Sequence, residues 1–417
     1  MRQVSDHPVW NKVLSMLYDD AVSELNINGP NSFYCMKRGV REKIEVPSLS
    51  GRRYLESIVK GLVPLMDSPT EYSEDDVLHE GPLRIGDFDT EGFIARCTVV
   101  FPPLAESPTV VIAKKSRELA TLERIASEGS MSASMLDFIH RAVDARLTCV
   151  ISGSSGAGKT TMLEALTKYI PRNIRFGVAE DTPELILTQP NTTYLRSIPW
   201  RPNMDANRTA DLSWVVKQFN RLRLDRLIIG ETRGKEFADF LVAANSGMDG
   251  SLTTIHANSP TLAVDKMTRF ALAGTPGQPI RSASEDIGQT IDLVIQLDRV
   301  LVNGSFRYRT TQIAEVSGTV ADTADAKLSL NTLFEYEVAN DCFVKRNNPS
   351  DKLMKTIEQR GVDTQPIREM RPGTSEKAFK PLFAREAPRT VEGAPAEPAA
   401  APERAVSPLK RNVGRQL

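Results

Sequence analysis

Short apolar runs and longer amphipathic segments alternate in the middle of the chain. The apolar runs are bounded by polar or glycine-rich turns and cover residues 147–151, 174–178, 227–229 and 252–255. Runs of this length predict buried strands, whereas Leu163, Leu166 and Ile170 between two of them follow the helical spacing. The alternation of strands with helices predicts a parallel α/β sheet.

The first part of the chain has a more mixed pattern. Val13, Leu14 and Leu17 lie on one side of an amphipathic helix, and the polar Asp19 and Asp20 follow it. Strand-like runs come next, at residues 24–28, 33–37 and 97–101. This mixture predicts a small α+β domain ahead of the α/β sheet.

The composition also changes along the chain and indicates domain boundaries. A polar, helix-forming stretch at 116–133 predicts a linker between an N-terminal α+β domain at 1–115 and an α/β domain at 134–318. Residues 365–417 are rich in proline and alanine and offer too little apolar surface for a core, so we expect a disordered tail. We expect residues 319–364, between the α/β domain and this tail, to form a C-terminal appendage.

Charge and hydropathy exclude some classes of protein. The chain carries 52 basic and 53 acidic side chains, and this near-neutral balance argues against a protein held to nucleic acid by bulk charge. No apolar run approaches the roughly 18 residues that span a bilayer, and the first residues lack the pattern of a signal peptide. We therefore expect a cytoplasmic protein without direct membrane insertion, which would reach a membrane only through partners.

A glycine-rich loop lies between the first apolar run and the helical segment after it. The sequence GSSGAGKTT at 153–161 therefore predicts the strand, loop and helix of a P-loop. Its glycines let backbone N–H groups turn toward phosphates, Lys159 reaches the β- and γ-phosphates, and Thr160 offers a hydroxyl to Mg²⁺. The residues predicted to bind ATP are Gly153, Ser155, Gly156, Ala157, Gly158, Lys159, Thr160 and Thr161.

Two other apolar runs end in carboxylates. Glu231 follows the run 227–229, and we expect this second strand to lie beside the P-loop strand and to deliver Glu231 to the metal or its water. Glu180 opens an acidic cluster after the run 174–178. It could polarise the attacking water or orient the metal, or the cluster could be an exposed turn with Asp181 as a helix cap.

A histidine and two arginines are further candidates. His256 ends the run 252–255, at the edge of the sheet where ligands of parallel sheets collect, and it could sense the γ-phosphate or be structural. Arg223 precedes the Glu231 strand and Arg233 follows it. Both fit a solvated basic helix end, but phosphoryl transfer also needs fixed positive charge near the γ-phosphate.

The order of four motifs resembles the type II/type IV secretion ATPase superfamily. GSSGAGKTT, AEDTPEL, LRLDRLIIGETRG and SGMDGSLTTIHANSP look like the Walker A motif, Asp box, Walker B motif and His box of that superfamily. The segments VSELNINGPNSFYCMKRGVREKI and ARCTVVFPPLAESPTVVIAKK resemble its N-terminal domain. The likeness covers residues 10–318. Residues 319–361, with LFEYEV, resemble the extra C-terminal piece of the tight-adherence (Flp) pilus assembly branch.

The resemblance implies a role for each matching residue. Lys159 and Thr160 would bind ATP and Mg²⁺, Glu231 would also act on the metal, and Glu180 and Glu231 would be catalytic carboxylates. His256 would sense the nucleotide. Arg223 would stabilise charge near the γ-phosphate, and Arg96 would reach the nucleotide from the N-terminal domain.

The chain departs from the superfamily pattern at two positions. Where an Ile-Arg-Lys sequence commonly ends the N-terminal domain, this chain has Ile112, Ala113 and Lys114. The proline expected after Arg223 is Leu224. The first departure removes a candidate phosphate-binding arginine, which puts the contribution of the N-terminal domain to catalysis in doubt.

The resemblance further implies an architecture and an assembly. A PAS-like α+β domain would precede a RecA-like P-loop domain, six copies would form a ring, and ATP hydrolysis would drive an inner-membrane platform protein of a pilus or secretion system. Three alternatives stay open: a RecA-like nucleic-acid motor of conjugative DNA transfer, a small-molecule P-loop kinase, and a nucleotide-gated scaffold without turnover. The 6% aromatic content counts against the first.

Overall fold

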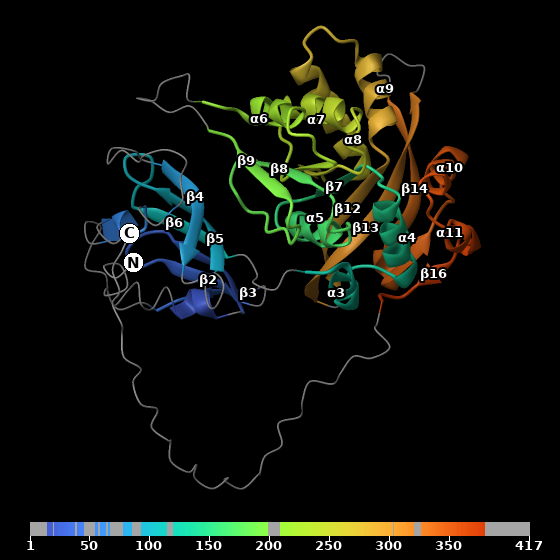
Figure 1. The fold of residues 1–417 in the computed structure, drawn as a ribbon. Helices are drawn as coiled ribbons and strands as arrows, with labels where there is room; N and C mark the ends of the chain where they lie inside the picture. Colours follow the sequence, from blue (N-terminus) through green and yellow to red (C-terminus); the bar gives the residue numbers. More distant parts are fainter. Residues whose placement is uncertain are drawn as a thin grey trace, which may run out of the picture. The chain divides into compact units, whose positions relative to one another are not determined.

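The computed structural model describes most of the chain. The described residues are 15–19, 21–37, 40–45, 55–56, 59–63, 66, 78–85, 93–114, 120–198, 209–302, 304–320 and 327–379. They all belong to one compact unit that ends at Lys380, and a second unit begins at Pro381. Two separate sheets form the framework of the first unit (Figure 1).

The first sheet has six antiparallel strands in the order β3-β2-β1-β6-β5-β4. Alternate residues of β5 are buried, namely Ala95, Cys97 and Val99, which is the period-two pattern of a sheet with one face on a core. The strands are β1 Val22–Ile27, β2 Phe33–Lys37, β3 Val40–Lys43, β4 Leu78–Ile85, β5 Phe93–Val100 and β6 Thr109–Lys114.

These strands confirm the three strand-like runs that the sequence predicted in this region. The predicted helix is described only over residues 15–18, where Leu17 is fully buried in the core of this sheet. Val13, Leu14 and Asp20 lie outside the described residues. The predicted small α+β domain therefore has an antiparallel sheet of six strands as its main element.

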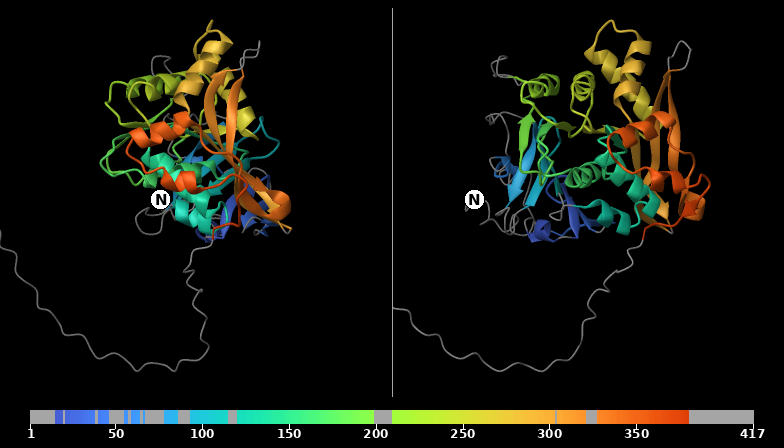
Figure 2. Two further views of the ribbon diagram at one scale, coloured as in Figure 1. Left: turned by 90° about the vertical axis from the view of Figure 1, so that its right-hand side faces the viewer. Right: turned by 45° about the vertical axis from the view of Figure 1, so that its right-hand side comes forward.

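The second sheet has ten strands, in the order β16-β15-β14-β13-β12-β7-β11-β10-β8-β9. The strands from β12 to β9 are parallel, and those from β12 to β16 are antiparallel. The strands are β7 Cys149–Gly153, β8 Phe176–Glu180, β9 Thr192–Arg196, β10 Arg226–Ile229, β11 Leu252–His256, β12 Leu293–Val302, β13 Ser305–Val320, β14 Leu328–Glu337, β15 Cys342–Lys345 and β16 Ser375–Glu376. Figure 2 shows β13, the longest described strand with 16 residues, in orange.

Helices cover both faces of the parallel strands. On β7, Cys149 and Ile151 point to a core that includes Phe138 of α4, whereas Val150 between them points to a core that includes Phe237 of α7. Burial on both faces explains why these strands are continuous apolar runs in the sequence. The helices are α3 Leu122–Ser127, α4 Ala133–Asp144, α5 Lys159–Lys168, α6 Leu212–Phe219, α7 Glu236–Ala244, α8 Pro260–Gly274, α9 Ile280–Thr290, α10 Asp351–Gln359 and α11 Gln365–Glu369, with a short 3₁₀ turn η3 Val338–Asn340.

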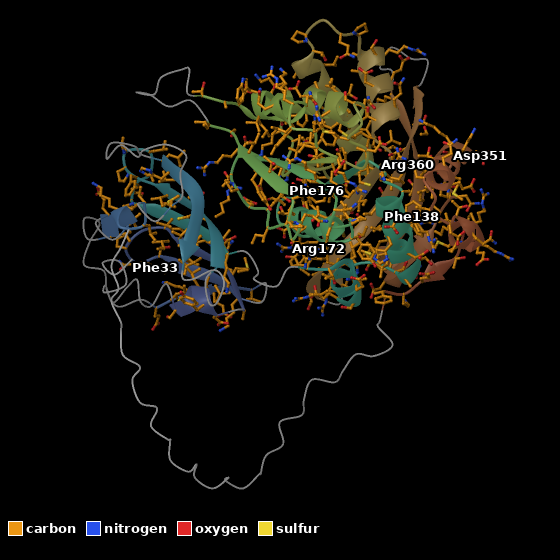
Figure 3. All side chains as sticks on the ribbon, viewed as in Figure 1. Phe33, Phe138, Arg172, Phe176, Asp351 and Arg360 are labelled. Atoms are coloured by element: carbon orange, nitrogen blue, oxygen red, sulfur yellow. The ribbon has the colours of Figure 1, made fainter. Side chains whose placement is uncertain are left out.

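The C-terminal helices pack against the same unit. Ile357 of α10 is fully buried with Phe138, and Arg360 donates hydrogen bonds to the carbonyl oxygens of Ala145 (2.7 Å) and Arg146 (2.5 Å) beyond the end of α4. Figure 3 labels Phe138 and Arg360 near each other in the α/β domain. The appendage therefore continues the core of the α/β domain.

The expectation of a disordered tail from residue 365 is wrong for residues 365–379. Ile367 of α11 is 1% exposed, and the Lys345 ammonium donates to the carbonyl oxygens of Ile367 (3.2 Å) and Met370 (2.6 Å). β16 pairs with β15 in the same segment. The composition of the whole segment is rich in proline and alanine, so it gave no indication that one isoleucine is buried or that two residues form a strand. The rest of the predicted tail, 380–417, lies outside the described residues.

Within the described part of the chain, no helix is both long enough and apolar enough to cross a bilayer.

Candidate functional site

The loop after β7 has the backbone of a phosphate-binding loop. Gly156 and Gly158 have φ angles of 71° and 91°, in the left-handed region that side chains disfavour, and Gly158 directly precedes α5. Gly153 must lack a side chain for a different reason, because a Cβ atom there would lie 2.6 Å from the carbonyl oxygen of Leu297 on β12. The sequence-predicted loop therefore forms at the carboxyl end of β7 and at the N-terminus of α5.

Lys159 begins α5, and its ammonium is held inside the site. The side chain is 7% exposed, and its Nζ donates to the carbonyl oxygen of Ser154 at 2.9 Å and lies 3.2 Å from Nδ1 of His256. Burial lowers the pKa of Lys159 to about 8, although Glu231 opposes this shift. The ammonium is thus poised for an anion, because a phosphate would favour its charged form.

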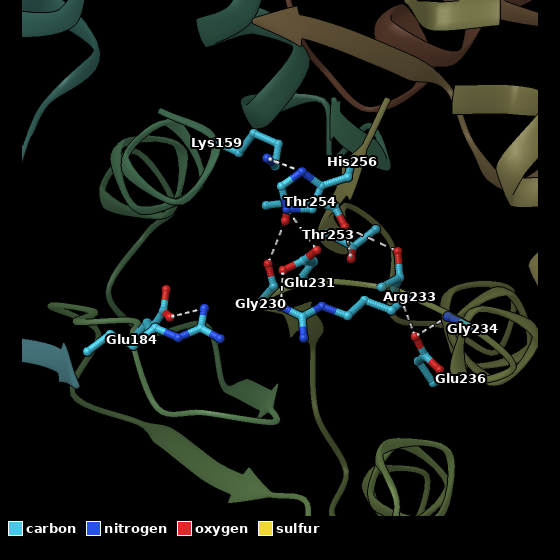
Figure 4. Close-up of polar contacts among 12 residues, drawn as sticks. Lys159, Glu184, Gly230, Glu231, Arg233, Gly234, Glu236, Thr253, Thr254 and His256 are labelled. Atoms are coloured by element: carbon cyan, nitrogen blue, oxygen red, sulfur yellow. Dashed lines mark hydrogen bonds and ion pairs between the residues drawn. The ribbon is translucent and has the colours of Figure 1, made fainter. Parts of the chain in front are cut away.

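His256 links Lys159 to the carboxylate of Glu231. Its Nε2 lies 3.0 Å from Oε1 of Glu231, and Figure 4 shows the imidazole between the two side chains. Burial, followed by the charge of Lys159, lowers the pKa of His256. The neutral ring then accepts from the lysine at Nδ1 and donates to the carboxylate from Nε2. The structure thereby brings three sequence-predicted residues into one chain of contacts.

Glu231 follows β10 and is held on its other side by Arg233. The guanidinium of Arg233 donates to Oε2 of Glu231 at 2.7 Å. Burial alone would raise the pKa of Glu231, but the hydrogen bond and charge of Arg233, with the charges of His256 and Lys159, lower it overall. The carboxylate is therefore ionised at neutral pH.

The strand that carries Glu231 is not the neighbour of the P-loop strand, contrary to expectation. β11 lies between β7 and β10, so His256 is delivered from the adjacent strand and Glu231 from the one beyond it. Periodicity identifies strands but does not order them, because the order depends on how the connecting helices cross the sheet. Glu231 still reaches the site because it lies past the end of its strand.

Glu180 at the end of β8 is buried and supports the acidic turn that follows. Its Oε1 accepts from the backbone N–H groups of Glu184 and Leu185, both at 2.9 Å. Gly230 makes room for it, since a Cβ atom there would lie 3.0 Å from Cγ of Glu180. Asp181 accepts from the hydroxyl of Ser197 at 2.7 Å, so it does not cap a helix. The cluster is therefore an organised turn beside the cavity, in which Glu180 is buried and Asp181 is exposed.

These groups line a cavity of about 380 Å³. Arg96 of β5 also lines it, and its guanidinium lies 3.2 Å from Oε1 of Glu184. From the P-loop, all predicted residues except Gly153 take part. The lining is made by Arg96, Ser155, Gly156, Ala157, Gly158, Lys159, Thr160, Thr161, Glu180, Asp181, Thr182, Glu184, Gly230, Glu231, Arg233, Thr254, His256 and Tyr308.

Arg223 is a predicted site residue that the structure places far from the P-loop. It is exposed, has a φ of 51°, and lies before the amino end of β10, whereas the cavity lies at the carboxyl ends of the strands. Leu224 after it is 7% exposed and packs over Gly177, where a Cβ atom would meet its Cδ1 at 2.0 Å. The leucine in place of the expected proline is therefore a core residue.

Comparison with known proteins gives this site its context. A family model described as type II/IV secretion system protein matches residues 94–373, more than half of the chain. The chain belongs to this family. It is 26% identical over 313 residues to a probable conjugal transfer protein TrbB of Sinorhizobium fredii, covering 72% of this chain and 88% of that protein.

Two further proteins are similar. The type IV secretion system protein VirB11 of Brucella suis is 26% identical over 324 residues, which is 70% of this chain and 85% of that protein. The X-ray structure of the Legionella pneumophila ATPase DotB is 13% identical, covers 86% of this chain and 87% of that one, and superposes with a TM-score of 0.50. At 13% identity, the similarity to DotB shows only that the two proteins share a fold.

The family membership confirms several predictions from the sequence. The protein is a member of the type II/IV secretion family, built on the predicted combination of an α/β P-loop domain and a preceding α+β domain. The resemblance is confirmed for the superfamily, while the tight-adherence branch stays a prediction.

Some site residues were not singled out from the sequence. Arg233 was a candidate, either in a solvated basic helix end or near the γ-phosphate, but its contact with Glu231 was not expected. Thr254 of β11 also lines the cavity, and its hydroxyl donates to the carbonyl oxygen of Gly230 at 2.7 Å. Tyr308 comes from β13, some 150 residues after the P-loop. A local signal existed only for Arg233, which lies two residues from a predicted catalytic carboxylate.

The donor set fits Mg²⁺ bound together with a nucleotide. Thr160 and Glu231 place a hydroxyl and an ionised carboxylate on the cavity wall. Among the described residues, no group of three or more histidine, cysteine, aspartate or glutamate side chains could hold a metal by itself. Mg²⁺ in phosphate-transfer sites commonly uses one or two protein oxygens together with phosphate oxygens and water. The residues present match that arrangement.

Proposed function

We propose that this chain is a motor that hydrolyses Mg-ATP and works as a homohexamer at a bacterial inner membrane, in pilus assembly or secretion. The observation that carries the proposal is the chain of contacts from Lys159 through His256 to Glu231 at the mouth of the P-loop. It joins a phosphate-binding cation to an ionised carboxylate inside one cavity.

In this proposal, Lys159 is the first group to respond to ATP. The β- and γ-phosphates replace the carbonyl oxygen of Ser154 and the His256 ring as its partners. His256 then keeps only its contact with Glu231 and is free to turn toward the γ-phosphate. Because the His256 ring contacts Lys159 through Nδ1 and Glu231 through Nε2, nucleotide binding at Lys159 would change the position of the ring beside Glu231.

Glu231 is the proposed general base, with Glu180 beside it. A carboxylate that is ionised at neutral pH can accept the proton of the attacking water, and Arg233 fixes its orientation. Glu180 keeps the acidic turn in place through two backbone N–H groups and gives the site a second carboxylate. Thr160 and Glu231 would hold Mg²⁺, which would offset the negative charge of the phosphates.

The assembly and the domain layout are also proposals. A ring would bring cationic side chains of a neighbouring copy to each nucleotide, and Arg96 would reach it from the N-terminal domain. The two separate sheets support a division into an N-terminal domain at 1–115 and a following α/β domain. The predicted bounds 134–318 and the linker at 116–133 need adjustment, because Leu122 and Ala126 of α3 are buried in the core of the second sheet and residue 318 lies within β13. We extend the appendage from 319–364 to 319–379, because α11 and β16 join the same fold.

The partner would be a platform protein of the inner membrane, with the ATPase on the cytoplasmic side. The segment LFEYEV at 333–338 carries the resemblance to the tight-adherence pilus branch, and all of it except Val338 lies in β14. A second candidate is conjugative DNA transfer, because the TrbB relative carries that description. Stimulation of hydrolysis by single-stranded DNA would favour this candidate over pilus assembly.

ATP hydrolysis by purified full-length variants tests the proposal. Lys159→Ala should abolish ATP binding and turnover, whereas Glu231→Gln should bind ATP and lose turnover, because the amide keeps the shape of the side chain without its charge. Lys168→Ala is the matched control, since Lys168 ends the same helix outside the cavity. Normal turnover in the Lys159 variant would refute the assignment.

A further inference from the structure

A second cavity adjoins the P-loop, and Lys159 does not line it. It has a volume of about 220 Å³ and shares Ala157, Gly158, Thr161 and Tyr308 with the first one. The two cavities are therefore neighbours along the N-terminus of α5. The residues that line only the second include Ile125, Ser130, Met162, Leu297 and Arg309.

The order of the strands gives the nucleotide a direction. β11 and β10, with His256 and Glu231, lie on one side of the P-loop strand, and β12 and β13 lie on the other side. Lys159, His256 and Glu231 mark the γ-phosphate end. The α-phosphate and the nucleoside must then point toward β12 and β13, where the second cavity lies. Figure 1 shows α3, α5, β12 and β13 in this part of the molecule.

We infer that the second cavity holds the ribose and the base of the ATP, and that the ring of Tyr308 stacks on the base. The inference rests on the proposed function, because it assigns the other half of the same nucleotide. Nothing in the P-loop motif itself selects a base, since the loop contacts phosphates only.

Tyr308 has the position and the exposure that stacking requires. Its side chain lines both cavities and is nevertheless 53% exposed. The ring lies beside the P-loop, because a Cβ atom added to Gly158 would be 3.9 Å from its Cδ1. An aromatic ring at the junction of a polar and an apolar cavity can cover a flat base while its hydroxyl stays in water. Ile125, Met162 and Leu297 supply the apolar surface beside it.

A buried donor on the wall of the cavity points to the same ligand. Arg309 is 6% exposed; its two terminal nitrogens donate to the carbonyl oxygen of Tyr308 (3.1 Å) and to Asp341 (3.3 Å). Its Nε is buried and has no partner among the described residues. Leaving a buried N–H without an acceptor is unfavourable, so a ligand that offers one gains affinity. The ring nitrogens of a base and the ribose oxygens are acceptors of suitable size.

The C-terminal appendage braces this wall. Asp341 in the turn after β14 receives Arg309 and the hydroxyl of Tyr336, the latter at 2.7 Å, and the Arg309 guanidinium lies 5.4 Å from the centre of the Tyr336 ring. Arg309 is thereby fixed before a ligand arrives, which lowers the entropy cost of binding. A wall held in this way is suited to selecting one base.

Binding of two ligands to the full-length protein tests the inference. The non-hydrolysable analogue AMP-PNP carries base, ribose and phosphates, whereas inorganic tripolyphosphate carries only the phosphates. Calorimetry with Mg²⁺ should show that Tyr308→Ala lowers the affinity for AMP-PNP by about 5- to 100-fold. This is the range expected for the loss of base stacking on an aromatic ring. Tripolyphosphate should change less than twofold, and Tyr308→Phe should keep the affinity for AMP-PNP.

Phe306→Ala is the matched control. Phe306 lies two residues away on the same strand and the same face, is 61% exposed, and lines neither of the two cavities. This substitution should leave the affinities for both ligands unchanged. The inference would be overturned if Tyr308→Ala lowered the two affinities equally, or lowered neither of them. The assignment of the phosphate site would still stand.

The unmutated protein gives a second criterion that does not depend on folding of a variant. AMP-PNP should bind at least about fivefold more tightly than tripolyphosphate, because only the former reaches the second cavity. Equal affinities would overturn the base site. If the unmutated protein bound neither ligand, the proposed ATPase site itself would fail, and the base site with it.

Discussion

The lowered pKa of Lys159 predicts how nucleotide affinity depends on pH. Burial sets this pKa at about 8 in the free protein. A bound triphosphate would keep the lysine protonated well above pH 8, because opposite charges stabilise each other. The affinity for the nucleotide should therefore be highest well below pH 8 and should fall as the pH rises through 8, since the free protein must then take up a proton on binding.

The expected size of the effect follows from the protonated fraction of free Lys159. At pH 7 about nine tenths of the molecules carry the proton, and at pH 9 about one tenth, so the affinity should fall by about tenfold. His256 and Glu231 contribute little in this window. Their pKa values lie below the ordinary values, so the first stays neutral and the second stays ionised.

The assay is calorimetric titration with Mg²⁺ and AMP-PNP at pH 7, 8 and 9, in buffers with different ionisation enthalpies. These should reveal uptake of nearly one proton per nucleotide at pH 9 and almost none at pH 7. Lys159→Arg is the control, because a guanidinium stays charged throughout, so any remaining affinity should not vary with pH. A flat profile in the unmutated protein would show that Lys159 does not carry the phosphate charge.

Two further predictions concern the ends of the fold and its assembly. Removal of residues after Phe379 should leave the melting temperature unchanged, whereas removal after Gly361 should lower it by at least about 4 °C, because the buried Ile367 and the carbonyl acceptors of Lys345 are lost. Arg223→Ala should lower turnover by about 10³-fold but change nucleotide affinity by less than about threefold, and turnover per chain should rise with protein concentration. Thermal unfolding and steady-state hydrolysis measure the two.

The P-loop could be predicted from the sequence because all its parts are contiguous. Strand, glycines, lysine and helix lie within some 20 residues, and each is recognisable from its own neighbours. His256 and Glu231 were recognisable as residues at strand ends, but not as neighbours of each other. Their contact depends on β11 being inserted between β7 and β10, which is a property of the crossover helices.

The second cavity could not be predicted for the same physical reason. Tyr308 and Arg309 reach the P-loop only because β13 pairs with β12 in an antiparallel hairpin and so extends the parallel sheet. No local sequence pattern predicts such an extension. The burial of Ile367 was missed because composition describes a segment as a whole, whereas one apolar side chain is enough to anchor a short helix.

The positions of the arginines connect catalysis to assembly. Near the cavity, Arg96 is paired with Glu184 and Arg233 with Glu231, so within the described residues these guanidinium groups already compensate carboxylates. Lys159 is then the main cation left for the triphosphate, and its burial weakens its hold on the proton. Charge that develops on the γ-phosphate in the transition state needs a further cation. Arg223 is exposed at the opposite end of β10, too far to serve its own site but accessible to another copy of the chain. We therefore expect the proposed site to hydrolyse ATP slowly in a single chain and faster in the proposed ring, which would couple hydrolysis to assembly.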